Sequence, residues 1–528
     1  MAQTTNSRLK AAGTMTGKTY TPSSVRAVSP RAKTKSRVAY ASISMIQLAM
    51  LTVVAVASLR SLPTAATYGL GSIALYIIPA ILFLVPTALV AAELATGWKG
   101  GVYVWVREAL GNRWGFVAVW LQWIQNVVWY PVQLAFVAAA AGFIFGRDTL
   151  GNSGLYTAIA ILVFYWISTA VALAGNNLFA KVGSLGGWIG TIIPGALLII
   201  LGIAWMVTKQ PSQTPLTFAA LNPLTSSASS GGSSTGFLAF LAPLVLVVSN
   251  FLAYAGMEVN AVHVNEMDNP GKQYPKAILI ATLLILAVFI IPTLAVAVIV
   301  PAKSLGLTTG INVAFQMYFE HWSMNWMTPV VSLMIVIGAL ASVITWIAGP
   351  SKGVLLASRT GLLPLALQKQ NKKGVQLGIL LLQGAIVSIL AMLFIFIPNV
   401  STAFFTLVDM AAALYLIMYM LMFAAVVILR KKQPNVKRAY RVPAVKLVAG
   451  VGFVSSLAAF ALGFIPPSQL GGIPSWAYPL LMLGVVLLLG LPPLIFYAIR
   501  KPDWKTITDE EFLNASSPQA VPPSKQDA

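Results

Sequence analysis

Two charged residues stand inside long apolar stretches of the sequence. Arg60 lies shortly before Pro63, and Glu258 lies shortly after Gly256. Charged side chains within a bilayer are costly, and they usually face a cavity or a transport pathway. Proline and glycine weaken helices, and a pair of broken helices in corresponding halves of a membrane chain indicates a transporter's binding site. The spacing of these residues therefore predicts a carrier of small solutes.

Each predicted break would expose backbone groups to a ligand. A helix that unwinds in mid-membrane frees N–H and C=O groups, which are tolerated where they line a cavity, bind a ligand or are buried in protein. The N-terminal ends of half-helices carry partial positive charge and suit a carboxylate. Alternatively, Pro63 is a simple kink and Gly256 a close-packing position. At the second break, the predicted substrate contacts are Tyr254, Ala255, Gly256 and Glu258.

The two charged residues offer different chemistry. Glu258 can take up a proton when its site closes, because burial favours a neutral carboxyl group, and it can accept hydrogen bonds when it is ionised. Arg60 keeps its charge. It could pair with Glu258, bind the carboxylate or side chain of a substrate, or reach water in an outer vestibule. An electropositive pocket would favour an acidic or zwitterionic substrate.

The composition indicates an all-α integral membrane protein. Of the 528 residues, 58% are hydrophobic and 9% are charged, whereas about one quarter of a soluble domain is charged. Many apolar runs reach the roughly 20 residues that span a bilayer as a helix. The chain has no cysteine, which excludes disulfides and thiolate metal sites. Its two histidines, His263 and His321, are far apart in sequence, so we expect no metal, no cofactor and no catalytic residues.

Twelve membrane spans are predicted, with both termini on one side. Residues 1–38 are expected to form a disordered basic cytoplasmic tail, residues 39–500 a twelve-helix transport domain, and residues 501–528 a disordered cytoplasmic tail. A short outer helix is expected within 305–326. The spans lie at about 40–62, 71–94, 114–144, 155–175, 181–207, 237–262, 277–300, 327–350, 377–398, 402–429, 443–465 and 477–499.

The net charge of +21 fits membrane topology better than nucleic-acid binding. The basic residues are spread over loops, and cytoplasmic loops of membrane proteins collect lysine and arginine. Alternate loops separate into a basic and a poorly charged set, which places both termini in the cytoplasm. The N-terminal tail could touch anionic lipid, or its charge could serve topology alone. The expected partners are the lipid bilayer and small molecules, and no feature of the sequence addresses the oligomeric state.

Three segments resemble one family of transporters. They are residues 93–106, residues 256–275 with their Gly256-Met257-Glu258 start, and residues 349–375. They resemble the amino acid–polyamine–organocation superfamily, most closely the bacterial glutamate/GABA antiporter family. The resemblance covers most of residues 38–500. It implies a multi-pass protein of the bacterial inner membrane.

The resemblance implies the LeuT-type fold. Inverted five-helix repeats would occupy about 40–207 and 237–429, two extra helices would follow at about 443–499, and helices one and six would unwind in mid-membrane. Lys181 would fill the place of a sodium ion found in other relatives and, with Glu258, couple proton movement to gating. Alternatively, Lys181 snorkels at the membrane edge. The further substrate contacts that the resemblance implies are Val56, Ala57, Ser58, Asn126 and Trp346.

Two of these implied positions have open alternatives. Trp346 would stack on the substrate or close over it, or it is an ordinary packing aromatic. Relatives usually lack an arginine at the place of Arg60, so the resemblance assigns that residue no role.

The resemblance implies secondary amino-acid transport by alternating access. We expect an antiporter that exchanges an amino acid for its decarboxylation product, with glutamate and GABA as the first pair and another amino acid and its amine as the alternative. Such exchange serves acid resistance. Proton-coupled uptake without exchange is the other mechanism, and an amino-acid sensor is a remote interpretation. No cluster of catalytic groups supports an enzyme. The tail from Asp503 has no histidine and several acids, so we expect no pH-dependent plug.

Overall fold

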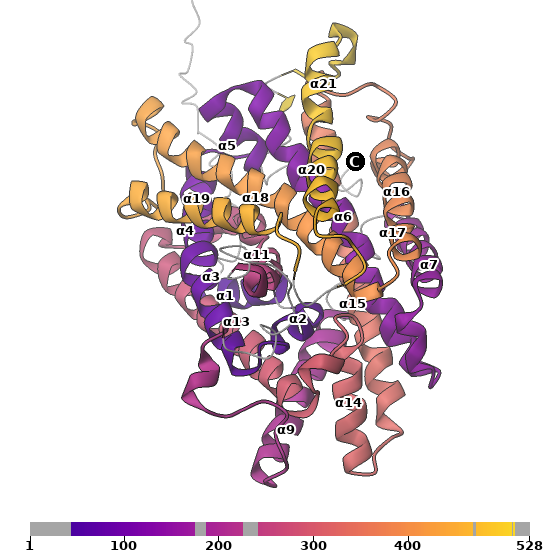
Figure 1. Cartoon of the computed structure of the whole chain (residues 1–528). Coiled ribbons are helices and arrows are strands. Elements are labelled where there is room, and N and C mark those ends of the chain that lie inside the picture. Colours follow the sequence, from indigo (N-terminus) through magenta and orange to yellow (C-terminus); the bar gives the residue numbers. More distant parts are fainter. Residues whose placement is uncertain are drawn as a thin grey trace, which may run out of the picture. The chain divides into compact units, whose positions relative to one another are not determined.

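The computed structural model describes residues 44–56, 58–174, 186–224, 241–467, 471–508 and 511–512. Every named element within these ranges is helical (Figure 1), in agreement with the predicted all-α class. One isolated β-bridge within them joins Thr360 to Lys505. The predicted N-terminal tail, Ala57 and Lys181 lie outside the described residues.

Ten helical stretches of the described chain are long and apolar enough to cross a membrane. They correspond to the second to fifth and the seventh to twelfth predicted spans, so the chain is a multi-pass helical membrane protein. In order they are η2 to α4 (Gly69–Gly97), α6 (Asn112–Ile144), α7 (Gly154–Leu173), η5 with α9 (Trp188–Val207), α13 (Pro270–Ile299), α15 (Met327–Ser358), α16 with α17 (Leu377–Phe396), α18 (Val400–Lys432), α19 (Val445–Leu462) and α20 with α21 (Ala477–Ile499).

The first predicted span is divided near Arg60. The helix α1 (Met45–Val56) ends before the short 3₁₀ turn η1 (Leu59–Ser61), which leads directly into α2 (Leu62–Ala66). Pro63 occupies the first turn of α2, where a missing N–H breaks no helical hydrogen bond. The proline therefore begins a second half-helix and does not kink a continuous one.

The sixth predicted span is divided at Gly256. The helix α11 (Val248–Tyr254) ends at Ala255, which is extended (φ −70°, ψ 153°). Gly256 then has φ +105° before α12 (Met257–Asn260) begins. A side chain strains the backbone at positive φ, so glycine is the residue that permits this turn. The first and sixth spans are absent from the ten long helices because each is split into shorter pieces.

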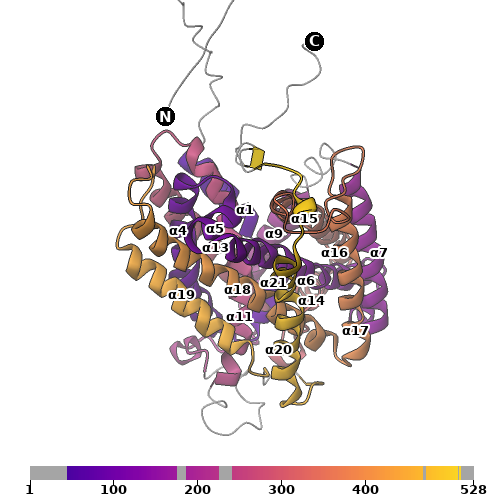
Figure 2. The same cartoon turned by 90° about the horizontal axis from the view of Figure 1, so that it is seen from above.

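The helices α6 and α18 lie at the centre of the membrane domain. Most of their side chains are buried by neighbouring helices, and α6 packs against both α15 and α18. In Figures 1 and 2, α7 and α16 lie on one side of α6, and α4, α13 and α19 lie on the other. The leucines and isoleucines of α20 and α21 are largely exposed, as expected of helices that face lipid.

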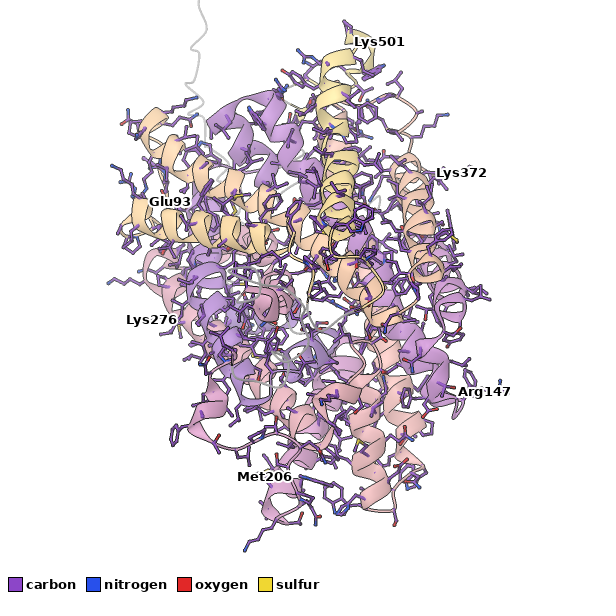
Figure 3. The ribbon with its side chains drawn as sticks, viewed as in Figure 1. Glu93, Arg147, Met206, Lys276, Lys372 and Lys501 are labelled. Atoms are coloured by element: carbon purple, nitrogen blue, oxygen red, sulfur yellow. The ribbon has the colours of Figure 1, made fainter. Side chains whose placement is uncertain are left out.

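Labelled residues mark two ends of this domain (Figure 3). Glu93, Lys372 and Lys501 lie toward one end, which we name the Lys501 end, whereas Arg147 and Met206 lie toward the opposite end, the Met206 end, and Lys276 lies between the two. The short helix predicted within 305–326 is present as α14 (Gly310–His321).

The first residues of the C-terminal tail pack on the domain, contrary to the disorder expected from their polar composition. The Thr506 N–H donates to the carbonyl of Arg359 (2.9 Å). Gln368 Nε2 donates to the carbonyl of Trp504 (2.8 Å), and the Thr506 hydroxyl donates to Gln368 Oε1 (2.9 Å). Backbone pairing and one buried glutamine side chain therefore hold this part of the tail.

Phe512 anchors the last described turn of the tail. Its side chain is 1% exposed, its ring centroid lies 5.3 Å from that of Tyr103 in α5 (Gly101–Leu110), and the Arg107 guanidinium lies 5.2 Å from it. Glu511 accepts hydrogen bonds from the N–H (2.7 Å) and hydroxyl (3.0 Å) of Thr508. These bonds lower the pKa of the Glu511 carboxyl. The Phe512 ring and the capping box of Thr508 and Glu511 thus hold residues for which the composition predicts disorder.

Candidate functional site

A cavity of about 670 Å³ lies between the two broken helices, α6, η5 (Trp188–Ile192) and α15. This volume is within the range of small-molecule binding sites. The predicted site residues that line it are Val56, Ser58, Arg60, Asn126, Ala255, Glu258 and Trp346.

The cavity reaches toward the Lys501 end of the domain. Its wall includes Gly101 and Trp105 of α5 and Lys352 of α15. The helix α5 lies at that end (Figure 1). The site is therefore connected to the end that carries Glu93 and Lys501.

Two predicted residues lie behind the cavity wall. Tyr254 is buried, and its hydroxyl donates to the carbonyl of Tyr76 (3.0 Å). The Gly256 N–H donates to the hydroxyl of Tyr419 (2.7 Å), and a Cβ at Gly256 would lie 3.4 Å from the ring of Trp346. Both residues shape the second break without lining the cavity.

Glu258 is satisfied by three neutral donors. Its side chain is 2% exposed. It accepts hydrogen bonds from Gln122 Nε2 (2.9 Å) and from the hydroxyls of Tyr415 and Tyr419. Such donors stabilise a carboxylate without a cation. The suggested pairing of Glu258 with Arg60 is therefore not observed.

Arg60 is a buried cation with two nitrogens that meet no hydrogen-bond partner in the described structure. It is 3% exposed, and its Nε and Nη1 atoms have no hydrogen-bond partner among the described residues. Its guanidinium lies 5.9 Å from the ring centroid of Phe404 in α18. Burial also contradicts a water-exposed vestibule position. An unpaired buried charge is strongly unfavourable, so the burial of these two nitrogens is costly in the described structure.

The remaining polar residues of the cavity are mostly amides and hydroxyls. Asn126 Nδ2 donates to the carbonyl of Gln122 (2.8 Å) one turn earlier in α6. Gln133, two turns further along α6, lines the cavity and has a buried Oε1 without a partner in the described structure. Within the described residues, no three histidine, aspartate or glutamate side chains come together to hold a metal. The α6 face thus offers hydrogen bonds to an organic solute.

Trp346 connects the cavity to the second break. It lines the cavity from α15, and its backbone carbonyl accepts a hydrogen bond from the Tyr130 hydroxyl (2.8 Å). Its ring centroid lies 6.4 Å from that of Trp129. The Trp346 indole therefore lies between the cavity and the Gly256 turn.

Sequence reasoning missed the three partners of Glu258. Tyr415 and Tyr419 are four residues apart in α18 and therefore share one helix face. A tyrosine pair at this spacing within an apolar span was a visible signal. Gln122 lies one turn before Asn126 on α6, so it could have been found as part of the same polar face.

A glycine crossing at the cavity wall supports a stability prediction. A Cβ on Gly338 of α15 would lie 2.5 Å from the Cα of Gly190 and 2.8 Å from the carbonyl of Gly186. Gly338→Ala is therefore expected to destabilise the protein by about 1–3 kcal/mol. Gly349→Ala is the matched control, because nothing lies within 4 Å of its Cβ position in the same helix. Thermal unfolding in detergent measures both, and equal melting temperatures would contradict the tight crossing.

Comparisons with known proteins agree with this architecture. A sequence model of the amino acid permease family matches residues 43–488. An uncharacterised transporter of Legionella pneumophila is 37% identical over 474 residues, covering 89% of this chain and 98% of the relative. A glutamate/gamma-aminobutyrate antiporter of Lactococcus lactis is 31% identical over 484 residues, covering 90% and 94%. An aspartate/glutamate permease of the same species is 23% identical, covering 85% and 93%.

The family match spans the first broken helix, the cavity and the second broken helix. The relatives are transporters, and the antiporter aligns over nearly its whole length. The chain therefore belongs to the amino acid permease family of the amino acid–polyamine–organocation superfamily, as a membrane transporter similar to the glutamate/GABA antiporters.

Proposed function

We propose that this transporter exchanges an amino acid, glutamate-like or neutral, for its decarboxylation product, GABA or another amine, by alternating access. Glutamate and GABA are the first pair to test. The names of the relatives support this choice. Transport requires no resident cofactor and no catalytic residue in this proposal.

Arg60 is the observation that carries the proposal. A guanidinium that is 3% exposed and has unpartnered Nε and Nη1 atoms is costly in an empty site. Each of these two N–H groups is a charged donor that a carboxylate oxygen can accept. A solute that carries a carboxylate would relieve this cost, so we expect the site to prefer such solutes. Glutamate and GABA both carry a carboxylate.

We assign the fold to the LeuT type, with twelve spans in two inverted repeats and the substrate between the two breaks. The Lys501 end, which also carries Lys372, would face the cytoplasm, because cytoplasmic loops collect basic residues. The cavity reaches α5 and Lys352 at that end. The arrangement would then correspond to an inward-facing state of the transport cycle.

The remaining site residues would take the roles that the family resemblance implies, and Ala57 and Lys181 lie outside the described residues. Val56, Ala57, Ser58 and Ala255 would offer backbone groups at the breaks, and Asn126 an amide. Trp346 would close over the solute, with Tyr254 and Gly256 supporting the turn beneath it. Glu258 and Lys181 would exchange protons, the lysine standing where other relatives hold sodium. An ammonium can replace sodium there because it supplies the same charge.

Counterflow in proteoliposomes tests the proposed function. Vesicles are loaded with glutamate, with GABA or with no solute, and labelled glutamate is added outside. Further vesicles contain tyrosine, tyramine, histidine or putrescine. Exchange predicts rapid uptake only into vesicles that contain a partner solute. Equal uptake into empty vesicles under a proton gradient would replace exchange with proton-coupled uptake. An absence of uptake with every pair would contradict amino-acid exchange.

Removal of residues 506–528 is expected to leave the pH profile of exchange unchanged. None of the described tail residues lines the cavity. Thr506 and Phe512 instead contact Arg359 and Tyr103. The measurement is exchange between pH 5 and 8 by full-length and shortened protein. Activity that emerges at neutral pH only after the deletion would identify the tail as a plug.

A further inference from the structure

Glu93 forms a buried junction away from the cavity. It lies in α4 (Val85–Gly97) and has no exposed surface. Arg430 of α18 donates from Nε to Oε1 (2.7 Å) and from Nη2 to Oε2, and the Val442 N–H donates to Oε2 (2.7 Å). Figure 3 shows Glu93 beside the orange ribbons of α18 and α19, and α4 packs on both helices. One carboxylate thus joins helices from the two halves of the chain.

A second cation and an indole reinforce the same junction. Arg438 Nε lies 3.6 Å from Glu93 Oε1, and its guanidinium lies 4.9 Å from the ring centroid of Trp98. Trp98 Nε1 donates to Gln433 Oε1 (2.7 Å). Trp98 follows α4 directly, whereas Gln433 and Arg438 follow α18. The contacts therefore join not only α4 and α18 but also the segments that follow these two helices.

The burial of Glu93 makes separation of α4 from α18 unfavourable. A carboxylate removed from water needs a cation and hydrogen bonds, and breaking a buried pair leaves an uncompensated charge. Within the described residues, the hydrogen-bond donors to the Glu93 carboxylate come from α18 or the segment after it. The pair Arg107–Glu108 differs because its side chains are 20% and 32% exposed, and exposed pairs contribute little. Breaking the Glu93 junction is therefore expected to cost more free energy than breaking the Arg107–Glu108 pair.

The helix α18 connects this junction to the solute site. Arg430 lies about three helical turns from Tyr419, and α18 is continuous between them. We propose that Glu93 is a positioning residue that holds α4 and α18 together as one body through the transport cycle. Tyr415 and Tyr419, which α18 carries, then keep their position relative to α4 in every state. This inference rests on the proposed function.

Spin-label distances test the rigid junction directly. The chain has no cysteine, so labels can be placed at K99C and K431C, two exposed positions beside the junction. We expect one narrow distance distribution in lipid, unchanged when glutamate or GABA is added. Glu93→Gln should broaden it, because the amide cannot balance two arginines. Glu320→Gln is the control, because this exposed carboxylate in α14 binds Gln316 of its own helix, and it should leave the distribution narrow. A distance that shifts with solute in the unmodified junction overturns the proposal.

Counterflow kinetics separate positioning from mere folding stability. Glu93→Gln should raise the KM for glutamate at least fivefold per folded transporter, and adding Arg430→Gln should recover most of that loss by removing the excess charge. A lower melting temperature with unchanged KM and unchanged distances would reduce Glu93 to a structural residue. If the parent protein shows no exchange, the proposed function fails, whereas the label distances still decide whether α4 and α18 move together.

Discussion

Replacing Arg60 with methionine is expected to stabilise the solute-free transporter and to abolish its preference for carboxylate solutes. The guanidinium is buried with two unpartnered nitrogens, so an apolar side chain of similar length should stabilise the empty protein by about 1–3 kcal/mol. Loss of a buried charge-assisted contact should weaken glutamate binding by about 3 kcal/mol, which raises KM about 100-fold. Stability and transport should therefore change in opposite directions.

Two measurements check this expectation. Thermal unfolding without solute should show a higher melting temperature for Arg60→Met, and glutamate should no longer raise it. Counterflow should show the KM increase for glutamate and GABA alike. Arg60→Lys is the control, because it keeps the charge but loses the planar fork, and we expect an intermediate KM. If Arg60→Met keeps the wild-type KM for every solute of the panel, Arg60 does not bind the solute.

Replacing Tyr419 with phenylalanine is the second change with a large expected effect. The Tyr419 hydroxyl accepts from the Gly256 N–H (2.7 Å) and donates to Glu258. Its removal leaves a buried N–H and weakens the support of a buried carboxylate. A lost partner of this kind costs about 1–3 kcal/mol. We expect exchange at low glutamate to fall about 30-fold, since the turn that closes the site loses its hold on α18.

Tyr415→Phe is the matched control for Tyr419→Phe. Tyr415 also donates to Glu258, but no contact joins its hydroxyl to Gly256 in the described structure. Its loss should therefore cost about one hydrogen bond to a charged group, with a fall of about tenfold. Counterflow with each variant measures the difference. Equal losses would show that only the contact with Glu258 matters.

The sequence was sufficient for the class of protein and for much of the cavity wall. Apolar runs predicted the long helices, and helix-weakening residues beside Arg60 and Glu258 marked the two interruptions. These features are local, because a helix break depends on a few neighbouring residues and Gly256 can adopt its positive φ because it lacks a Cβ. The resemblance to a family added Asn126 and Trp346, which line the same cavity.

The partners of the charged residues were beyond sequence reasoning because they depend on how distant helices pack. Glu258 finds its donors more than one hundred residues away, in α6 and α18. The packing of distant helices also decides that Arg60 Nε and Nη1 meet no hydrogen-bond partner within the part of the chain that the structure describes. The polar composition also predicted disorder for the described first part of the C-terminal tail, where the buried Phe512 ring packs on the domain.

The docking of Phe512 on α5 has a consequence for where the protein can be cut or labelled. The Phe512 ring lies against Tyr103 and the Arg107 guanidinium. Removal of this residue would uncover an aromatic face on the transport domain, and uncovered aromatic surface favours association between copies. A label joined after residue 512 leaves this contact in place, whereas one that replaces the turn does not.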